Sequence, residues 1–151
     1  MNADLKTSQE GISLIKSFEG CELSAYRCSA NVPTIGYGHT AGVSDGDTCT
    51  LEEAEEMLTE DLVEFENYVK KYVETDLEQN QFDSLVAWVY NLGPKNLSES
   101  TLLKELNAGN LEEVPRQMKR WNRAGGQVLD GLIRRREAES RLFKGEAWEN
   151  V

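Results

Sequence analysis

Residues 21–48 interrupt an otherwise helical sequence, and this interruption limits the folds that the chain can adopt. Before it, apolar residues recur at the spacing of one helix face, at Ile12, Ile15 and Phe18, and Gly20 ends that pattern. Within it the helical period is lost, and glycines, asparagine and Pro33 separate short apolar pieces. We therefore expect a small, irregular antiparallel sheet that follows an N-terminal helix.

Helical patterns resume after the interruption. Thr50 and Glu53 have the spacing of a capping box, in which each side chain accepts a hydrogen bond from the other residue's backbone N–H. They predict a long helix over about 51–73. A further helix is predicted for Gln79–Leu92, where Gly93-Pro94 ends it, and another is capped by Ser98 and ends near Gly109. A capping box of Asn110 and Glu113 predicts the start of the next helix. After a turn at Gly125-Gly126, the last helix is predicted from about Leu129 to Phe143.

These elements predict an α+β fold in one domain of 151 residues. We expect a small antiparallel sheet lobe at about 20–50 and a mostly helical lobe at about 75–151. The N-terminal helix, which Ser8 is predicted to cap, joins the helical lobe, and the helix at about 51–73 connects the two. A cleft between the lobes is the expected place for an extended ligand, with Glu19 at its base.

The charge distribution makes nucleic acid a poor partner. The net charge is -11, and residues 1–100 hold 19 of the 27 acidic side chains but only 6 of the 16 basic ones. Such a surface does not attract a phosphate backbone. The basic cluster Arg134-Arg135-Arg136 is predicted to be a solvated helix face paired with Glu137 and Glu139.

Hydropathy and the cysteine count indicate a cytoplasmic protein without a metal site. No apolar run approaches the ~20 residues of a membrane span, and the start, MNADLKTSQEG, has no apolar signal region. Cys21, Cys28 and Cys49 are an odd number, which argues against a disulfide framework. His39 is the single histidine and no second cysteine cluster is present, so we expect no metal and no cofactor.

Glu19, Cys28 and Thr34 supply groups that glycoside cleavage requires. That reaction uses one carboxylic acid to protonate the leaving oxygen and a second group to activate water or attack the sugar. Glu19 follows Phe18 and suits the acid, although a surface glutamate at a helix end is the simpler explanation of its position alone. Thr34 can orient a water, although threonine is also an ordinary strand residue. Gly36 and Gly38 would allow close backbone approach to a sugar.

The pattern E-x8-C-x5-T followed by IGYGHT resembles the active-site segment of the phage lysozymes, the endolysins of glycoside hydrolase family 24. FDSLVAWVYNLGP, STLLKELNAGN and RWNRAGGQVLDGLIRRREAESRLF resemble later segments of that family in the same order, so the similarity covers nearly all of residues 8–144. The resemblance implies a lysozyme-like fold and an N-acetylmuramidase. Its substrate would be the β-1,4 bond between N-acetylmuramic acid and N-acetylglucosamine in peptidoglycan, cleaved to lyse a bacterial host at the end of phage infection.

The same resemblance assigns roles by position. Glu19 is the general acid, Cys28 occupies a position where most relatives have aspartate, and Thr34 holds the attacking water. The positions that line the sugar cleft are Thr40, Tyr90 and Asn91, and His39 is expected to be structural. The implied partners are peptidoglycan strands, without nucleic acid or stable membrane insertion. We expect a monomer that accumulates in the host cytoplasm and reaches the wall after a holin opens the membrane.

Three roles in the cleavage reaction are open for Cys28: a thiolate base, a covalent nucleophile, or a polar spacer beside Thr34. Some relatives with a signal-arrest-release anchor have this cysteine together with one at the position of Cys21, and a disulfide between the two holds them inactive. No such anchor is visible here, so we expect that switch not to operate in the same form. Oxidation that joins Cys28 to Cys21 or Cys49 is predicted to lower activity, because the sulfur would leave its catalytic position.

Two other functions fit the same residues. A lytic transglycosylase would use Glu19 alone and form a 1,6-anhydro sugar, but the presence of Thr34 favours hydrolysis. A disarmed lysozyme fold that only binds glycan or a protein partner is suggested by the missing aspartate, and the presence of Glu19 and Thr34 argues against it.

Overall fold

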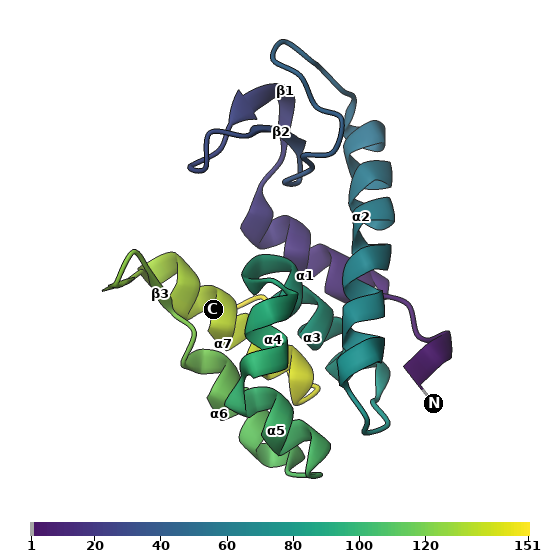
Figure 1. Cartoon of the computed structure of the whole chain (residues 1–151), viewed down its shortest axis with the longest axis vertical. Coiled ribbons are helices and arrows are strands. Elements are labelled where there is room, and N and C mark those ends of the chain that lie inside the picture. Colours follow the sequence, from purple (N-terminus) through teal and green to yellow (C-terminus); the bar gives the residue numbers. More distant parts are fainter. Residues whose placement is uncertain (1) are drawn as a thin grey trace. The chain divides into compact units, whose positions relative to one another are not determined.

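The computed structural model describes residues 2–151, which form two compact units (Figure 1). The sheet unit comprises Ile15–Glu64. The helical unit combines the N-terminal residues through Leu14 with Phe65–Val151. Helices α1 (Gln9–Glu19) and α2 (Leu51–Tyr72) each have residues in both units.

The sheet unit contains the small irregular sheet that the sequence predicts. Strand β1 (Glu22–Arg27) pairs antiparallel with β2 (Pro33–Gly36), and the register shifts between Glu22 and Tyr26. This shift marks a bulge, which bends a strand and lets its backbone pair elsewhere. The bulged residues pair with the segment before α2, where Ser24 faces Thr48.

Helix α2 begins where its capping box predicts. The Thr50 N–H donates to Glu53 Oε1 at 2.9 Å, and the Glu53 N–H donates to Thr50 Oγ1 at 3.1 Å. Its apolar face is buried along the helix, at Ala54, Leu58, Leu62 and Val69. Gly36 packs against this face, since a β-carbon there would lie 3.3 Å from that of Ala54. Gly36 therefore serves the approach of β2 to α2, and its predicted approach to a sugar stays a prediction.

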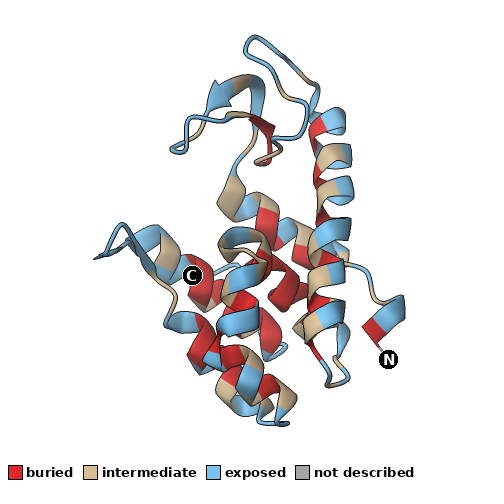
Figure 2. Cartoon of the chain, in the orientation of Figure 1, coloured by how far each residue is buried: buried red, intermediate tan, exposed pale blue. Residues whose placement is uncertain are grey.

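The helical unit is built around α3 (Gln79–Leu92), whose residues 82–89 are all buried (Figure 2). Helix α7 (Asp130–Phe143) packs against both α3 and α6 (Val114–Lys119). The remaining elements are the 3-10 helices η1 (Asn2–Asp4) and η2 (Leu111–Glu113), the short helices α4 (Pro94–Glu99) and α5 (Thr101–Asn107), and the hairpin of β3 (Arg123–Ala124) and β4 (Gln127–Val128). In that hairpin Gly125 and Gly126 both have positive φ, which confirms the predicted turn.

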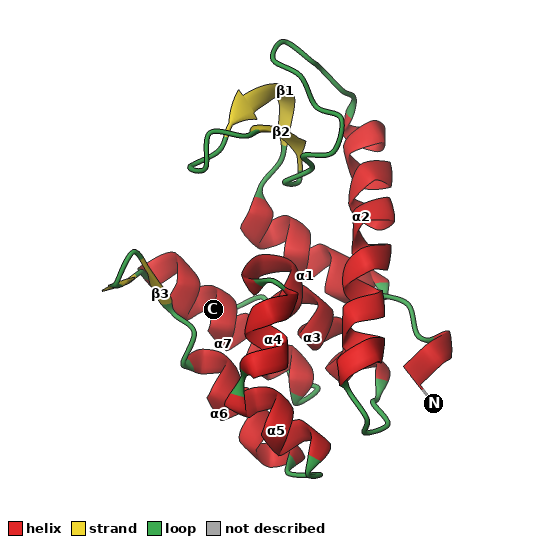
Figure 3. Ribbon diagram, in the orientation of Figure 1, coloured by secondary structure: helices red, strands yellow, loops and turns green. Residues whose placement is uncertain are grey.

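The secondary structure confirms the predicted α+β class. Figure 3 shows strands only in residues 22–36 and 123–128, with helices over most of the rest. None of the helices in residues 2–151 combines the length and the apolar character that crossing a bilayer requires.

Two predicted helix caps, at Ser98 and Asn110, are wrong. Ser8 directly precedes α1 and its hydroxyl donates to Asp83 of α3, so its cap of α1 stays a prediction. Ser98 lies inside α4, because Pro94 at the first helical position starts that helix, and Ser100 caps α5 instead by accepting from the Leu103 N–H at 3.0 Å. Asn110 makes no side-chain cap to η2, since its amide donates to Glu105 at 2.7 Å.

The predicted solvated face at Arg134-Arg135-Arg136 is also wrong, because two of the three arginines are buried. Arg135 is 4% exposed and Arg136 is fully buried, and each lies beside the fully buried Glu139. The Arg135 Nε is 3.1 Å from Glu139 Oε2 and the Arg136 Nε is 3.0 Å from Oε1. Residues three and four apart share a helix face, and here that face points into the unit. Glu137 contacts Lys119 and Arg141 instead.

The capping box gives a stability prediction. Thr50→Ala removes the acceptor for the Glu53 N–H and should lower the free energy of unfolding by about 1 kcal/mol. Urea denaturation followed by circular dichroism measures this loss. The matched control is Thr59→Ala, in the exposed middle of α2, where alanine has the higher helix propensity and no loss is expected. Equal losses in the two variants would contradict the capping role.

Candidate active site

Glu19 is the last residue of α1 and is half-buried. Gly20 follows it with φ of 68°, and the Gly20 N–H donates to the Lys16 carbonyl at 3.3 Å. A glycine in the left-handed region is a common helix end, because other residues are strained there. The helix therefore stops directly after Glu19, and the chain continues into β1.

A tight turn from Cys28 to Val32 joins β1 to β2. The Cys28 N–H donates to the Val32 carbonyl at 3.1 Å, and the Asn31 N–H donates to the Cys28 carbonyl at 2.8 Å. Asn31 has φ of 62°, a conformation that asparagine tolerates better than most residues. This turn fixes Cys28 at the end of the hairpin.

The turn stabilises a negative charge on Cys28. Hydrogen bonds from the Val32 and Ala30 N–H groups are the main cause that lowers the pKa of the Cys28 thiol, and the Thr34 hydroxyl adds to them against the opposing effect of burial. Donors that favour the charged form lower the pKa of an acid, and successive backbone N–H groups in a turn form an anion-binding site. The same donors would stabilise any anion at this position, including a carboxylate.

Thr34 lies beside Cys28 and is only 3% exposed. Its Oγ1 donates to the Val32 carbonyl at 2.8 Å, and it also lies within hydrogen-bonding reach of the Cys28 sulfur. A hydroxyl has one proton, so it can serve only one of these acceptors at a time. The thiolate is the stronger acceptor because it is charged. Ionisation of Cys28 would therefore draw the Thr34 proton toward the sulfur.

Tyr26 is a site residue that the sequence analysis missed. Partial burial raises the pKa of Tyr26, and the negative charges of Glu22, Cys28 and Glu19 raise it further. A charge affects a phenol in this way only from nearby, so the Tyr26 hydroxyl lies within electrostatic reach of both Glu19 and Cys28. The sequence did hold one signal for Tyr26: it lies two residues before Cys28 at the end of a strand, and residues two apart in a strand share one side.

Thr40 follows a second tight turn in the sheet unit. Ile35 and His39 exchange backbone hydrogen bonds of 2.9 Å each, and Thr40 is exposed directly after them. The His39 Nδ1 lies 2.8 Å from Asp61 Oδ2 of α2, so the histidine ties this turn to the helix. That contact gives His39 a structural role, as the resemblance implies.

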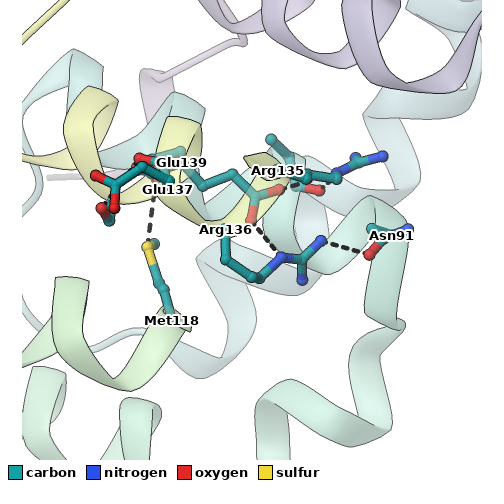
Figure 4. Close-up of polar contacts among 9 residues, drawn as sticks. Asn91, Met118, Arg135, Arg136, Glu137 and Glu139 are labelled. Carbon is teal, nitrogen blue, oxygen red and sulfur yellow. Dashed lines mark hydrogen bonds and ion pairs between the residues drawn. The ribbon is translucent and has the colours of Figure 1, made fainter. Parts of the chain in front are cut away.

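Tyr90 and Asn91 lie at the end of α3, in the helical unit. The Tyr90 ring is half-buried and packs edge-to-face on Phe65, with ring centroids 5.0 Å apart. Asn91 is exposed, and its Oδ1 accepts a hydrogen bond from the buried Arg136 (Figure 4). The sequence analysis missed Arg136, which orients the Asn91 amide from inside the unit.

The structure thus groups the predicted residues in two sets. Cys28 and Thr34 are in contact in the sheet unit, and Tyr26 links them electrostatically to Glu19. Tyr90 and Asn91 are neighbours in the helical unit. Among residues 2–151 no three His, Cys, Asp or Glu side chains are close enough to hold a metal ion. The predicted cleft between the lobes stays a prediction.

Comparison with known proteins defines the class of this fold. The muramidase domain of SpmX from Asticaccaulis excentricus superimposes with a TM-score of 0.87 at 39% identity, covering 92% of this chain and 97% of that domain. The fold is therefore lysozyme-like, which confirms the fold that the resemblance implies.

The phage lysozyme family profile matches residues 16–139, and the chain belongs to that family. The endolysin of Bacillus phage B103 is 43% identical over 97% of this chain, and the chain spans 57% of that relative's length. The endolysin of Salmonella phage P22 is 37% identical over 92% of this chain and 98% of its own length.

The cysteine environments predict selective alkylation. Burial raises the pKa of Cys49, and the nearby charges of Cys21 and Glu53 raise it further, whereas the turn lowers the pKa of Cys28. Because the thiolate is the nucleophile, iodoacetamide at pH 7 should label Cys28 several-fold faster than Cys49. Mass spectrometry of timed digests measures both rates. Raising the pH should narrow the difference, and faster labelling of Cys49 would contradict the role of the turn.

Proposed function

We propose that the chain is an endolysin that hydrolyses the β-1,4 bond between N-acetylmuramic acid and N-acetylglucosamine in peptidoglycan. Membership of the phage lysozyme family supports this activity. The observation that carries the proposal is the contact between Cys28 and Thr34 in a turn that stabilises an anion. It supplies a base and a water-orienting hydroxyl at the positions where the family pattern expects them.

In the proposed reaction Glu19 is the general acid, which gives its proton to the leaving glycosidic oxygen. Water attacks the anomeric carbon from a position fixed by Thr34 Oγ1, and the Cys28 thiolate accepts the proton of that water. Cys28 then returns its proton to solvent, and Glu19 regains one. The Val32 and Ala30 N–H groups support this role, because they favour the thiolate that the step consumes.

Thr40, Tyr90 and Asn91 are proposed to contact the glycan. Asn91 suits this role because Arg136 holds its carbonyl oxygen, which leaves the exposed amide nitrogen free to donate. The packing of Tyr90 on Phe65 similarly fixes its ring. Fixed polar and aromatic groups bind sugars with little loss of side-chain entropy.

The biological setting follows from the same proposal. The enzyme would accumulate in the host cytoplasm as a monomer and reach the cell wall once a holin opens the inner membrane, so that lysis ends the phage infection. The endolysin relatives support action on the wall. The monomer and the release route rest on the resemblance.

Glu19→Gln should lower murein hydrolysis about 1,000-fold, because the amide cannot donate the proton. The release of reducing sugar from purified murein measures the activity, with circular dichroism as a check on folding. The matched control is Glu22→Gln, an exposed glutamate of β1 three residues later, which should retain activity. Equal activity of wild type and Glu19→Gln would refute the proposal.

Mass spectrometry of the same digests separates the related functions. Hydrolysis adds one water to each product, whereas 1,6-anhydro products would identify a lytic transglycosylase and exclude the proposed water attack. Binding to murein without any soluble product would identify a binding protein.

A further inference from the structure

The three cysteines are free thiols of the sheet unit, and each is half-buried. The proposed reaction uses Cys28 and leaves Cys21 and Cys49 without a role. Their positions on paired backbone segments determine which of them can meet.

Cys49 lies across from the start of β1. Its N–H donates to the Leu23 carbonyl at 2.9 Å, and the Ala25 N–H donates to the Asp47 carbonyl at 2.8 Å. This antiparallel pairing sets Cys49 opposite Leu23. Cys21 lies directly before β1, two residues ahead of Leu23, so where the backbone stays extended it is on the same side as Leu23. Cys21 and Cys49 are therefore diagonal neighbours, whose α-carbons in such a pair lie about 7–8 Å apart.

A disulfide needs α-carbons about 4.4–6.8 Å apart, so the pair must close by about one ångström. Gly20 provides the freedom for this movement. It precedes Cys21 with φ of 68° and has open space around its α-carbon.

Cys28 is too far from Cys21 to compete. The Cys28 N–H pairs with Val32, whereas Glu22, next to Cys21, pairs with Gly36. The extended segment from Val32 to Gly36 separates these two pairings by roughly 13 Å. A bond between Cys21 and Cys28 would require the hairpin to unfold.

We propose that Cys21 and Cys49 form a dithiol oxidation site, which closes to a reversible disulfide in an oxidising environment and leaves Cys28 as a free thiol. The electrostatics agree, since the charge of Cys21 contributes to raising the pKa of Cys49, after burial. Cys49 also lines a surface cavity of about 280 Å³ with His39, Val43 and Met57, through which a small oxidant reaches it. This inference does not depend on the proposed enzymatic activity.

The reaction with a small-molecule disulfide such as oxidised glutathione balances as two exchanges. One cysteine thiolate attacks the reagent's sulfur and forms a mixed disulfide, releasing one glutathione thiolate. The second cysteine thiolate then attacks the protein sulfur and releases the second glutathione. The two cysteines lose two electrons and two protons, and the reagent gains them as two thiols.

The bond would have two consequences. It closes a covalent ring through residues 21–49, which should raise the melting temperature by about 5–10 °C. It also leaves Cys28 outside the disulfide, so oxidation at this site would leave the Cys28 thiol reactive.

The test incubates the full chain with oxidised glutathione and maps the cross-links by mass spectrometry without reduction. Cys28 and Cys49 share the tryptic fragment 28–70, so a second cleavage at Asp45 or Asp47 is needed to distinguish them. The variants are Cys21→Ser, Cys49→Ser and Cys28→Ser, each melted before and after oxidation.

The expected result is a link between Cys21 and Cys49 in wild type and Cys28→Ser, with free thiols in wild type falling from three to one. The rise in melting temperature should accompany this link and disappear with reductant. Cys21→Ser and Cys49→Ser should show neither effect. A link that includes Cys28, or no link in wild type, would overturn the proposal.

Discussion

The hydrogen-bonded turn from Cys28 to Val32 is the interaction on which the proposed chemistry depends. Its backbone bonds set the end of the β1–β2 hairpin, and the N–H groups that remain point at the Cys28 sulfur. A thiol has a usual pKa well above that of a carboxylic acid, so a cysteine in a carboxylate position needs such donors to supply an anion. The turn also sets the place of Thr34, since Val32 accepts bonds from both Cys28 and Thr34.

In the helical unit, a group of buried charged side chains orients a residue at the surface. Arg135, Arg136 and Glu139 are buried together, and burying charge is tolerable only when partners compensate it. Two of those partners lie on α3: the Ala87 carbonyl accepts from Arg135 at 3.1 Å, and Asn91 accepts from Arg136. The buried cations therefore link α7 to α3 and orient Asn91 at the surface. Removing one arginine would leave Glu139 poorly compensated, so these side chains contribute to the unit's integrity as well as to its surface.

The sequence predicted correctly those helix ends and turns that depend only on residues close together in the chain. The capping box at Thr50 and Glu53, the helix end at Gly20 and the turn at Gly125-Gly126 each involve residues close in the chain. The cap at Asn110 failed because its side-chain amide is engaged by Glu105. The burial of Arg135 and Arg136 could not be predicted from their spacing, because the packing of α7 against α3 decides it. At the site, Tyr26 lies close to Cys28 in the chain, but only the fold brings Glu19 within its reach.

The central claim is that Cys28 acts as an anion beside Thr34, and the pH dependence of kcat/KM on murein tests it directly. In wild type the rate should rise with pH as Cys28 loses its proton and fall again once Glu19 loses its own. Cys28→Asp should be active, with its rising limb moved to lower pH, because a carboxylic acid ionises far below a thiol. Circular dichroism across the same range separates loss of folding from loss of activity. An unchanged rising limb in Cys28→Asp would contradict the account, since the group that titrates would then not be Cys28.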